Sequence, residues 1–224
     1  MTNPSGTAST CNCTAALITA AGMSSRMKTF KPMLPLGDQS IIQRQIETLR
    51  RAGCSPIVVV TGHRAEELRQ HLRKCNVEFV HNQRYRDTQM LDSIRIGLKY
   101  LTGRCQRVVF TPVDIPMFSE QTVRALIAVD AMVVIPTCEG KKGHPILLRS
   151  DLFPTILDLQ VSGGLREILE LHPSSQSYVA VEDPAILPDV DTPEEYLALL
   201  KEHQLRCSIH SACATWQSKQ EEMT

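Results

Sequence analysis

The sequence predicts an α/β fold of the Rossmann-like kind, in which one domain contains a mostly parallel sheet flanked by helices. Short apolar runs rich in β-branched residues alternate along the chain with segments of helical period. The runs are mainly apolar, as in strands whose two faces are both covered by helices. The chain contains no internal repeat and no low-complexity linker, so we expect a single domain.

Each expected strand is a short, mainly apolar run. In chain order, strands are expected at residues 15–18, 56–60, 77–80, 107–110, 132–135 and 145–148. The second of these runs is fully apolar and ends at Thr61-Gly62. Because the strands are separated by segments long enough to cross over a sheet, parallel pairing is favoured.

Helices are expected between the strands, at residues 41–52, 65–74, 90–101 and 122–129. The first of them has Ile42, Ile46 and Leu49 at helical spacing and stops at Gly53. A last helix is expected after residue 191. The residues after about His203 show no clear period, so we expect a lead at 1–13, the domain at 14–203 and a tail at 204–224.

Composition excludes several classes of protein. Lys and Arg number 24, as do Asp and Glu, in a chain of 224 residues. Such a balance argues against a protein that binds nucleic acid or a membrane surface through excess charge. The chain starts without the basic and apolar regions of a secretory signal, and its 8 cysteines lack zinc-site spacing. We therefore expect a cytoplasmic protein with reduced thiols.

The turn after the first strand has the composition of a phosphate-binding loop. Small residues at 20–22 allow close approach to the backbone, and the loop then carries hydroxyls and cations: Ser24, Ser25, Arg26, Lys28 and Lys31. Ligands of open α/β sheets bind beyond the carboxyl ends of strands, where this loop lies. It lacks the ending of a Walker loop and the glycines of a dinucleotide fingerprint. A surface loop with solvated cations is the alternative.

Two aspartates follow patterns that suit a metal ion. Asp114 comes after the strand at 107–110 and is flanked by prolines. A carboxylate at the end of a buried strand needs a partner, and Mg²⁺ prefers hard oxygen ligands. Asp191 begins the run Asp-Thr-Pro-Glu-Glu before the last expected helix. That run also suits a helix start, with Asp or Thr as the cap and Pro at the first position, so capping and metal binding both remain open.

The loop at 17–34 resembles the signature loop of the nucleotidyltransferases that include molybdenum cofactor cytidylyl- and guanylyltransferases. Those proteins carry L-x-A-(A/G)-G-x-S-x-R-M-G, followed by Lys and an apolar stretch. The matching residues here are Leu17, Ala20, Ala21, Gly22, Ser24, Arg26, Met27, Lys31 and Leu34. Lys28 replaces the last glycine of the motif, and Ala21 is the form that the family associates with cytidine nucleotides.

The resemblance extends over about residues 14–200. It covers the two aspartate motifs, the turn Gly143-His144-Pro145, and a segment running from Asn82 to Gly97. It implies a fold of the nucleotide-diphospho-sugar transferase type, with Mg²⁺ held by Asp114 and Asp191. Arg26, Lys31 and Asp114 would be catalytic, and His144 would contact the acceptor. The residues that the resemblance implies in nucleotide binding are Leu17, Ala20, Ala21, Gly22, Ser24, Arg26, Lys31, Asn82 and Ser93.

The activity that the resemblance implies is transfer of CMP from CTP to the phosphate of molybdopterin, with release of pyrophosphate. A molybdenum hydroxylase would then receive the product. Two other transferases stay open, one using GTP with the same cofactor and one acting on a sugar or alcohol phosphate. A non-catalytic nucleotide-binding module is the remaining alternative, which the presence of both aspartates and both cations disfavours.

Overall fold

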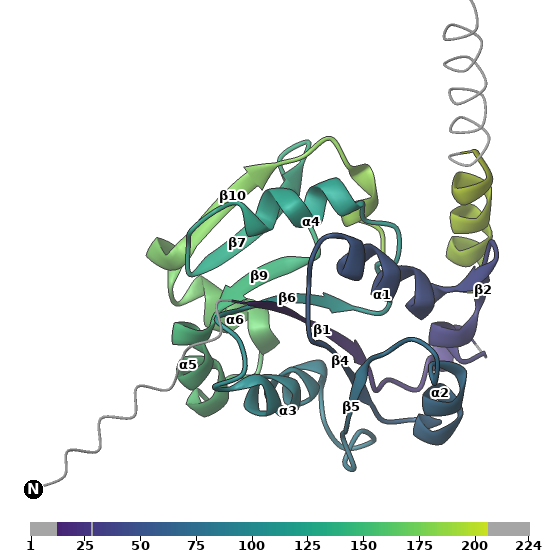
Figure 1. Cartoon of the computed structure of the whole chain (residues 1–224), viewed down its shortest axis with the longest axis horizontal. Coiled ribbons are helices and arrows are strands. Elements are labelled where there is room, and N and C mark those ends of the chain that lie inside the picture. Colours follow the sequence, from purple (N-terminus) through teal and green to yellow (C-terminus); the bar gives the residue numbers. More distant parts are fainter. Residues whose placement is uncertain (1–12, 28, 206–224) are drawn as a thin grey trace, which may run out of the picture.

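The computed structural model describes residues 13–27 and 29–205, so Lys28 and most of the expected lead and tail lie outside the described residues (Figure 1). It confirms the predicted α/β class. The six expected strands are β1 (Thr14–Ala20), β4 (Ile57–Thr61), β5 (Glu78–His81), β6 (Arg107–Pro112), β7 (Val133–Cys138) and β9 (Ile146–Arg149). The four expected helices are α1 (Ile41–Arg51), α2 (Ala65–His71), α3 (Met90–Leu101) and α4 (Glu120–Ile127).

Short elements without a readable period were not predicted. They are the hairpin of β2 (Pro35–Leu36) and β3 (Gln39–Ser40), strand β8 (Lys141–Lys142), helices α5 (Phe153–Asp158) and α6 (Gly164–Glu170), and strand β10 (Gln176–Ala180). The helix expected after residue 191 spans 193–205, where the described part ends. Among the described residues, none of the helices is long and apolar enough to cross a membrane.

The main sheet has the strand order β10-β7-β9-β6-β1-β4-β5, with β8 paired to β7. β1 pairs in parallel with β4 and β6, and β4 pairs in parallel with β5. β9 is antiparallel to both β6 and β7, with Ile146 opposite Phe110. Because β9 runs the opposite way, the turn before it reaches the edge of the sheet where β6 ends. That edge is where ligands bind in such sheets.

Helices cover both faces of the sheet, which explains why its strands are apolar throughout (Figure 1). Successive residues of β1 point to opposite faces. Ala15 and Leu17 belong to the apolar cluster on the side of α3, α5 and α6. Ala16 and Ile18 belong to the cluster on the side of α1, α2 and α4. The whole of β1 is buried, so the loop that follows it starts from a rigid support.

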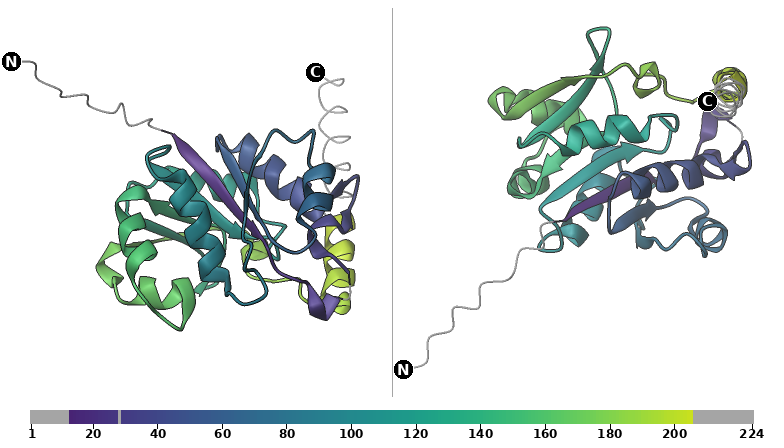
Figure 2. Two further views of the ribbon diagram at one scale, coloured as in Figure 1. Left: turned by 90° about the horizontal axis from the view of Figure 1, so that it is seen from below. Right: turned by 45° about the horizontal axis from the view of Figure 1, so that its top comes forward.

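A third, smaller apolar cluster joins the helix at 193–205 to the β2–β3 hairpin, and it includes Leu36, Ile41, Val190 and Leu199. Tyr196 adds a hydrogen bond from its hydroxyl to the carbonyl oxygen of Pro35, 2.6 Å away. Figure 2 shows this helix, in yellow, beside the hairpin in both views. The packing brings the run that precedes the helix back towards the loop after β1.

Candidate active site

Three strands end together at the edge where the predicted site lies. In the sheet register, Ala20 at the end of β1 is opposite Thr61 at the end of β4. On the other side, Thr19 is opposite Pro112 at the end of β6. The loop after β1, the glycine after β4 and the turn after β6 therefore share one edge, as the sequence predicted for the first and the last.

The loop after β1 is closed by its own hydrogen bonds. Ser24 adopts a left-handed backbone conformation with φ 52°, and its Oγ accepts from the backbone N–H of Lys31 at 3.2 Å. Its carbonyl oxygen also accepts from Met27 N–H at 3.1 Å. The Ser24 hydroxyl thus holds Lys31 in place. Gly22 lies at the open end, where an added Cβ would have no atom of the described residues within 4 Å.

Gly62 was not predicted as part of the site, yet the loop depends on it. A Cβ at Gly62 would lie 2.5 Å from the Ala21 carbonyl oxygen and 2.9 Å from the Ala21 Cβ. The next residue, His63, donates its backbone N–H to the same oxygen at 3.1 Å. Only glycine allows this close approach. A glycine placed directly after a fully buried strand was the available signal.

Two cations of the loop meet Asp191. Lys31 Nζ lies 2.6 Å from Asp191 Oδ1, and Arg26 Nη2 lies 2.5 Å from Oδ2. The Lys31 side chain is 7% exposed, whereas that of Arg26 is 71% exposed. Lys31 is therefore a buried charge at the base of the site, and Arg26 is an exposed one at its rim. Residues far apart in the sequence are brought together here.

The structure also decides which residue starts the last helix. Glu195 Oε2 accepts from the backbone N–H groups of Asp191 (2.7 Å) and Thr192 (2.8 Å). Thr192 Oγ1 accepts in turn from Glu195 N–H at 3.2 Å, which completes a capping box. Thr192 is the cap, so the Asp191 carboxylate is left to face the two cations. This removes the capping interpretation of Asp191.

Asp114 is partly buried and lies close to the same charges. Its Oδ1 is buried and has no hydrogen-bond partner among the described residues. Its carbonyl oxygen accepts from Val190 N–H at 2.9 Å, which ties the two aspartate segments together. Burial raises the pKa of Asp114, Lys31 lowers it, and the charges of Asp191 and Asp189 raise it, with a net rise.

These two carboxylates fit a divalent cation. For Asp191, burial raises the pKa, but hydrogen bonds and charges from Lys31 and Arg26 outweigh it and the net pKa is lowered. Asp191 is thus ionised, and the unpartnered Oδ1 of Asp114 is a second hard ligand beside it. No group of three or more metal-binding side chains occurs in the described part of the chain. A cation held here would complete its shell with water and phosphate oxygens, as Mg²⁺ commonly does.

Three predicted nucleotide-binding residues lie below the surface of the site. Leu17 is 0% exposed and packs against the Cα of Gly97 on α3. Asn82 and Ser93 are buried and joined by a hydrogen bond from Asn82 Nδ2 to Ser93 Oγ at 3.1 Å. Asn82 Nδ2 also donates to Thr88 Oγ1 at 3.0 Å. These contacts support the loop at 82–89 from beneath, so any effect on the nucleotide acts through that loop.

His144 lines a cavity of about 720 Å³. Its ring packs edge-on against Phe110, with the ring centres 5.6 Å apart. Nδ1 is buried without a hydrogen-bond partner in residues 13–27 and 29–205. Burial lowers the pKa of His144 to about 4, while Phe110 and Asp189 raise it. Asp189 acts on both His144 and Asp114, which places the cavity next to the two aspartates.

The cavity around His144, the residue that the resemblance assigns to the acceptor, is lined by apolar and polar side chains. Its apolar wall is formed by Leu91, Ile94, Phe110, Ile135, Ile146, Leu165 and Leu169. The polar residues that line it are Gln89, Lys141, Lys142, Arg166 and Gln176 among others. Lys142 is held by the hydroxyl of Tyr178 at 2.8 Å. A mainly apolar wall with cations suits a flat, phosphorylated molecule.

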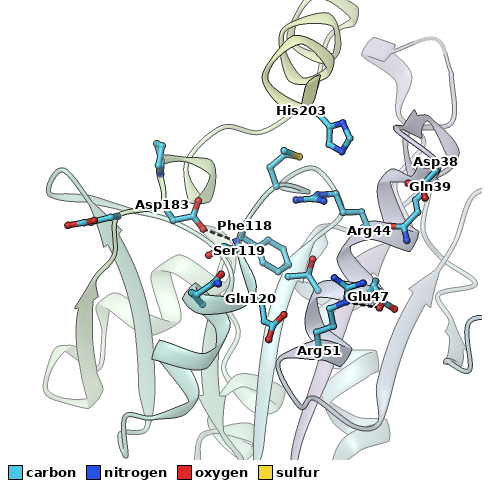
Figure 3. A pocket seen from close by; sticks show the side chains of 15 residues that line it. Asp38, Gln39, Arg44, Glu47, Arg51, Phe118, Ser119, Glu120, Asp183 and His203 are labelled. Atoms are coloured by element: carbon cyan, nitrogen blue, oxygen red, sulfur yellow. Dashed lines mark hydrogen bonds and ion pairs between the residues drawn. The ribbon is translucent and has the colours of Figure 1, made fainter. Parts of the chain in front are cut away.

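A larger cavity of about 860 Å³ lies between α1, α4 and the helix at 193–205 (Figure 3). Arg44, Glu47, Phe118, Asp183 and His203 are among its lining residues. Of the described residues that were predicted for the site, none is in its lining. The sheet edge and the loop after β1, rather than this larger cavity, therefore define the candidate active site.

The fold and this site define a nucleotidyltransferase: an α/β sheet whose first loop presents two cations to Asp191, with the Asp114 turn tied to the segment before Asp191. The chain belongs to the family of MobA-like NTP transferase domains, whose model matches residues 16–178. It is 27% identical over 183 residues to the molybdenum cofactor cytidylyltransferase of Escherichia coli K12, covering 81% of this chain and 92% of that one.

Solved structures show the same fold. A nucleotidyl transferase from Methanothermobacter thermautotrophicus has a TM-score of 0.77 at 24% identity, covering 88% of this chain and 100% of that one. A manganese complex of Rv0371c from Mycobacterium tuberculosis has a TM-score of 0.73 at 22% identity, covering 86% of this chain and 100% of that one. These neighbours agree with the predicted nucleotide-diphospho-sugar transferase type of fold.

Proposed function

We propose that this nucleotidyltransferase transfers CMP from CTP to the phosphate of molybdopterin and releases pyrophosphate, using Mg²⁺. The observation that carries the proposal is the meeting of Arg26 and Lys31 with Asp191 beside the unpartnered carboxylate oxygen of Asp114. Such a site has cations for a triphosphate and hard ligands for a divalent metal. The similarity to the E. coli cytidylyltransferase supports the choice of substrates.

In the proposed reaction, an oxygen of the acceptor phosphate attacks the α-phosphorus of CTP. The bond from that phosphorus to the bridging oxygen breaks, and pyrophosphate leaves with the electron pair. Bound Mg²⁺ supplies charge neutralisation at the reacting phosphate oxygens. Arg26 and Lys31 bind the triphosphate and stabilise the negative charge that develops on the leaving group. In the ligand-free protein both cations pair with Asp191, so they must exchange that partner for phosphate oxygens.

Ala21 supports cytidine as the base. Its Cβ would be 2.9 Å from a Cβ at Gly62 and is 6% exposed, so the methyl group lies fixed at the floor of the loop. The choice of cytidine rests on the resemblance, in which Ala at this position goes with cytidine nucleotides and a second glycine goes with guanine nucleotides. We expect Ala21→Gly to raise activity with GTP relative to CTP.

The cavity around His144 supports a heterocyclic acceptor. Its apolar side chains, among them Phe110, Ile94 and Leu165, form a wall against which a flat ring system can pack. His144 is neutral at pH 7 because burial lowers its pKa to about 4, so it would act as a neutral hydrogen-bonding group. The charge of the acceptor phosphate would be met by Lys141 and Lys142.

The reducing compartment expected for such a reaction agrees with the thiols of Cys54, Cys75 and Cys138, which are free. We propose a cytoplasmic location on that ground, with a molybdenum hydroxylase as the recipient of the product. The stretch 14–203 is proposed as the catalytic domain.

Pyrophosphate release tests the proposal, with Mg²⁺, each of the four ribonucleotides and molybdopterin as acceptor. We expect release with CTP and its loss in Asp114→Ala, while Asp130→Ala, which removes a side chain that is 91% exposed, keeps it. Release with GTP alone would support the guanylyl alternative. Pyrophosphate release only when a sugar phosphate replaces molybdopterin would refute molybdopterin as the acceptor. Nucleotide binding without any release would favour a non-catalytic module.

A further inference from the structure

Gln45 is a buried polar side chain of α1 that contacts the turn carrying Asp114. It is 0% exposed, and its Nε2 donates to the carbonyl oxygens of Pro112 (2.9 Å) and Ile115 (3.0 Å). Both partners are acceptors, so the amide nitrogen must lie on this side. A single side chain therefore holds the turn at both ends, immediately before and after the aspartate.

The turn needs donors from outside because its own backbone supplies few. Pro112 and Pro116 have no N–H group, and the N–H of Val113 is used by the carbonyl oxygen of Thr19 on β1 at 3.2 Å. Buried carbonyl groups must be paired. Gln45 supplies a donor to both carbonyls, and the Thr111 hydroxyl is a second donor to the Pro112 oxygen at 3.1 Å.

Gln45 is not a fully satisfied core residue. Its Oε1 is buried and has no hydrogen-bond partner in the part of the chain that the structure describes, and an unsatisfied buried acceptor lowers stability. Its neighbour Arg44 faces the cavity on the other side of α1 (Figure 3). A polar residue kept in the core at such a cost needs an explanation beyond the fold.

We propose that Gln45 is a positioning residue that fixes the carboxylate of Asp114 for metal binding. The turn is held by β1 through Thr19, by the second aspartate segment through Val190 N–H on Asp114 O (2.9 Å), and by α1 through Gln45. The inference rests on the proposed function, in which Asp114 and Asp191 hold the cation. Mg²⁺ demands near-ideal ligand geometry, so a turn released on one side presents its carboxylate poorly.

The test measures Mn²⁺ binding by electron paramagnetic resonance, with CTP present and no acceptor, so that no turnover occurs. Gln45→Met keeps the length of the side chain and removes both donors. We expect its Mn²⁺ affinity to fall about 10- to 100-fold, the usual effect of losing a group that orients a metal ligand. CTP affinity without metal should not change. In the pyrophosphate assay, kcat should fall by a similar factor while KM for CTP stays the same.

Gln43→Met is the matched control, the same substitution two residues away on α1. It removes the Gln43 Oε1 that accepts from Ser40 N–H at 2.9 Å in the capping box, and it does not touch the turn. We expect a lower melting temperature and unchanged Mn²⁺ affinity. Equal losses of Mn²⁺ affinity in both variants would mean general destabilisation and would overturn the inference. If Gln45→Met does not fold, Gln45→Asn, one methylene too short to hold both carbonyls, takes its place with the same expectation.

Asp114→Asn distinguishes a failure of the proposed metal site from a failure of the role of Gln45. If it binds Mn²⁺ as the wild type does, the proposed metal site is wrong and the role of Gln45 fails with it. If Asp114→Asn loses Mn²⁺ while Gln45→Met retains wild-type affinity, the metal site stands and the role of Gln45 is refuted. Loss in Asp114→Asn and Gln45→Met, with Gln43→Met unaffected, supports both.

Discussion

Replacing Asp114 by Asn should make the ligand-free protein more stable while abolishing metal binding. The pKa of Asp114 is raised by burial first, and the charges of Asp191 and Asp189 add to this against the opposing effect of Lys31. The folded protein therefore disfavours the ionised carboxylate. Asn keeps the shape of the side chain and removes the charge, so the cost of burying an ionised carboxylate disappears.

The magnitude follows from the buried Oδ1, which has no partner among the described residues. Asn leaves a neutral polar group in this place, which costs less to bury than a charge, and the nearby Lys31 offsets part of the cost of the charge in the wild type. A net gain of about 1 kcal/mol raises the melting temperature of a protein of this size by roughly 2–4 °C. Differential scanning calorimetry at neutral pH measures it, with Asp87→Asn as the control for removing an exposed carboxylate.

The pH dependence of this gain provides the sharper test. A group whose pKa is raised by folding contributes stability at low pH and loses it as the pH rises through the raised value. Wild-type Asp114 is protonated below that pH, so the difference between the wild type and Asp114→Asn should shrink on acidification. Adding Mn²⁺ to the CTP complexes should stabilise only the wild type further. The reasoning would be refuted if Asp114→Asn melted below the wild type at neutral pH. It would also be refuted if the difference in melting temperature did not change with pH.

Four further predictions concern the charges, the close contacts and the open space of the site. Lys31→Met should lower the free energy of unfolding by about 3 kcal/mol because it breaks a buried ion pair. Arg26→Met should lower it by at most about 1 kcal/mol because the Arg26 side chain is exposed. Urea unfolding of both variants compares the two losses, and equal losses would contradict the difference in burial between Lys31 and Arg26. Folding lowers the pKa of His144 from 6.5 to about 4, so the stability present above pH 6.5 should be lost as the pH falls towards 4, by about 3 kcal/mol in total. His144→Gln should lack this loss of stability on acidification. If the urea midpoints of the variant and the wild type were identical across this pH range, the pKa of His144 would not be lowered by folding. Gly62→Ala should destabilise the protein by about 1–3 kcal/mol because its Cβ would meet a backbone oxygen. Gly22→Ala should leave the thermal stability unchanged, because the added Cβ enters the open space above the loop. The same Cβ should weaken CTP binding in calorimetric titrations. If the variant bound CTP as tightly as the wild type, the nucleotide would bind elsewhere.

The sequence by itself determined the alternation of buried strands and helices. Fully apolar runs such as the one ending at Thr61 require cover on both faces, and this is a local property of composition. The loop after β1 was also readable, because small residues followed by Arg26 and Lys31 form a contiguous pattern. Short elements such as β10 and α6 were not readable, since they are shorter than the windows in which a period appears.

Tertiary structure alone decided how the site is assembled. Asp191 could have capped the last helix, but Thr192 and Glu195 form the capping box and leave its carboxylate to Lys31 and Arg26. The reversed direction of β9 brings His144 to the same edge, which a sequence without pairing information could not show. Gln45 looked like any residue within an amphipathic helix. Its role depends on two carbonyls that come into reach only when the turn after β6 packs against α1, because contacts between distant segments are set by packing rather than by local pattern.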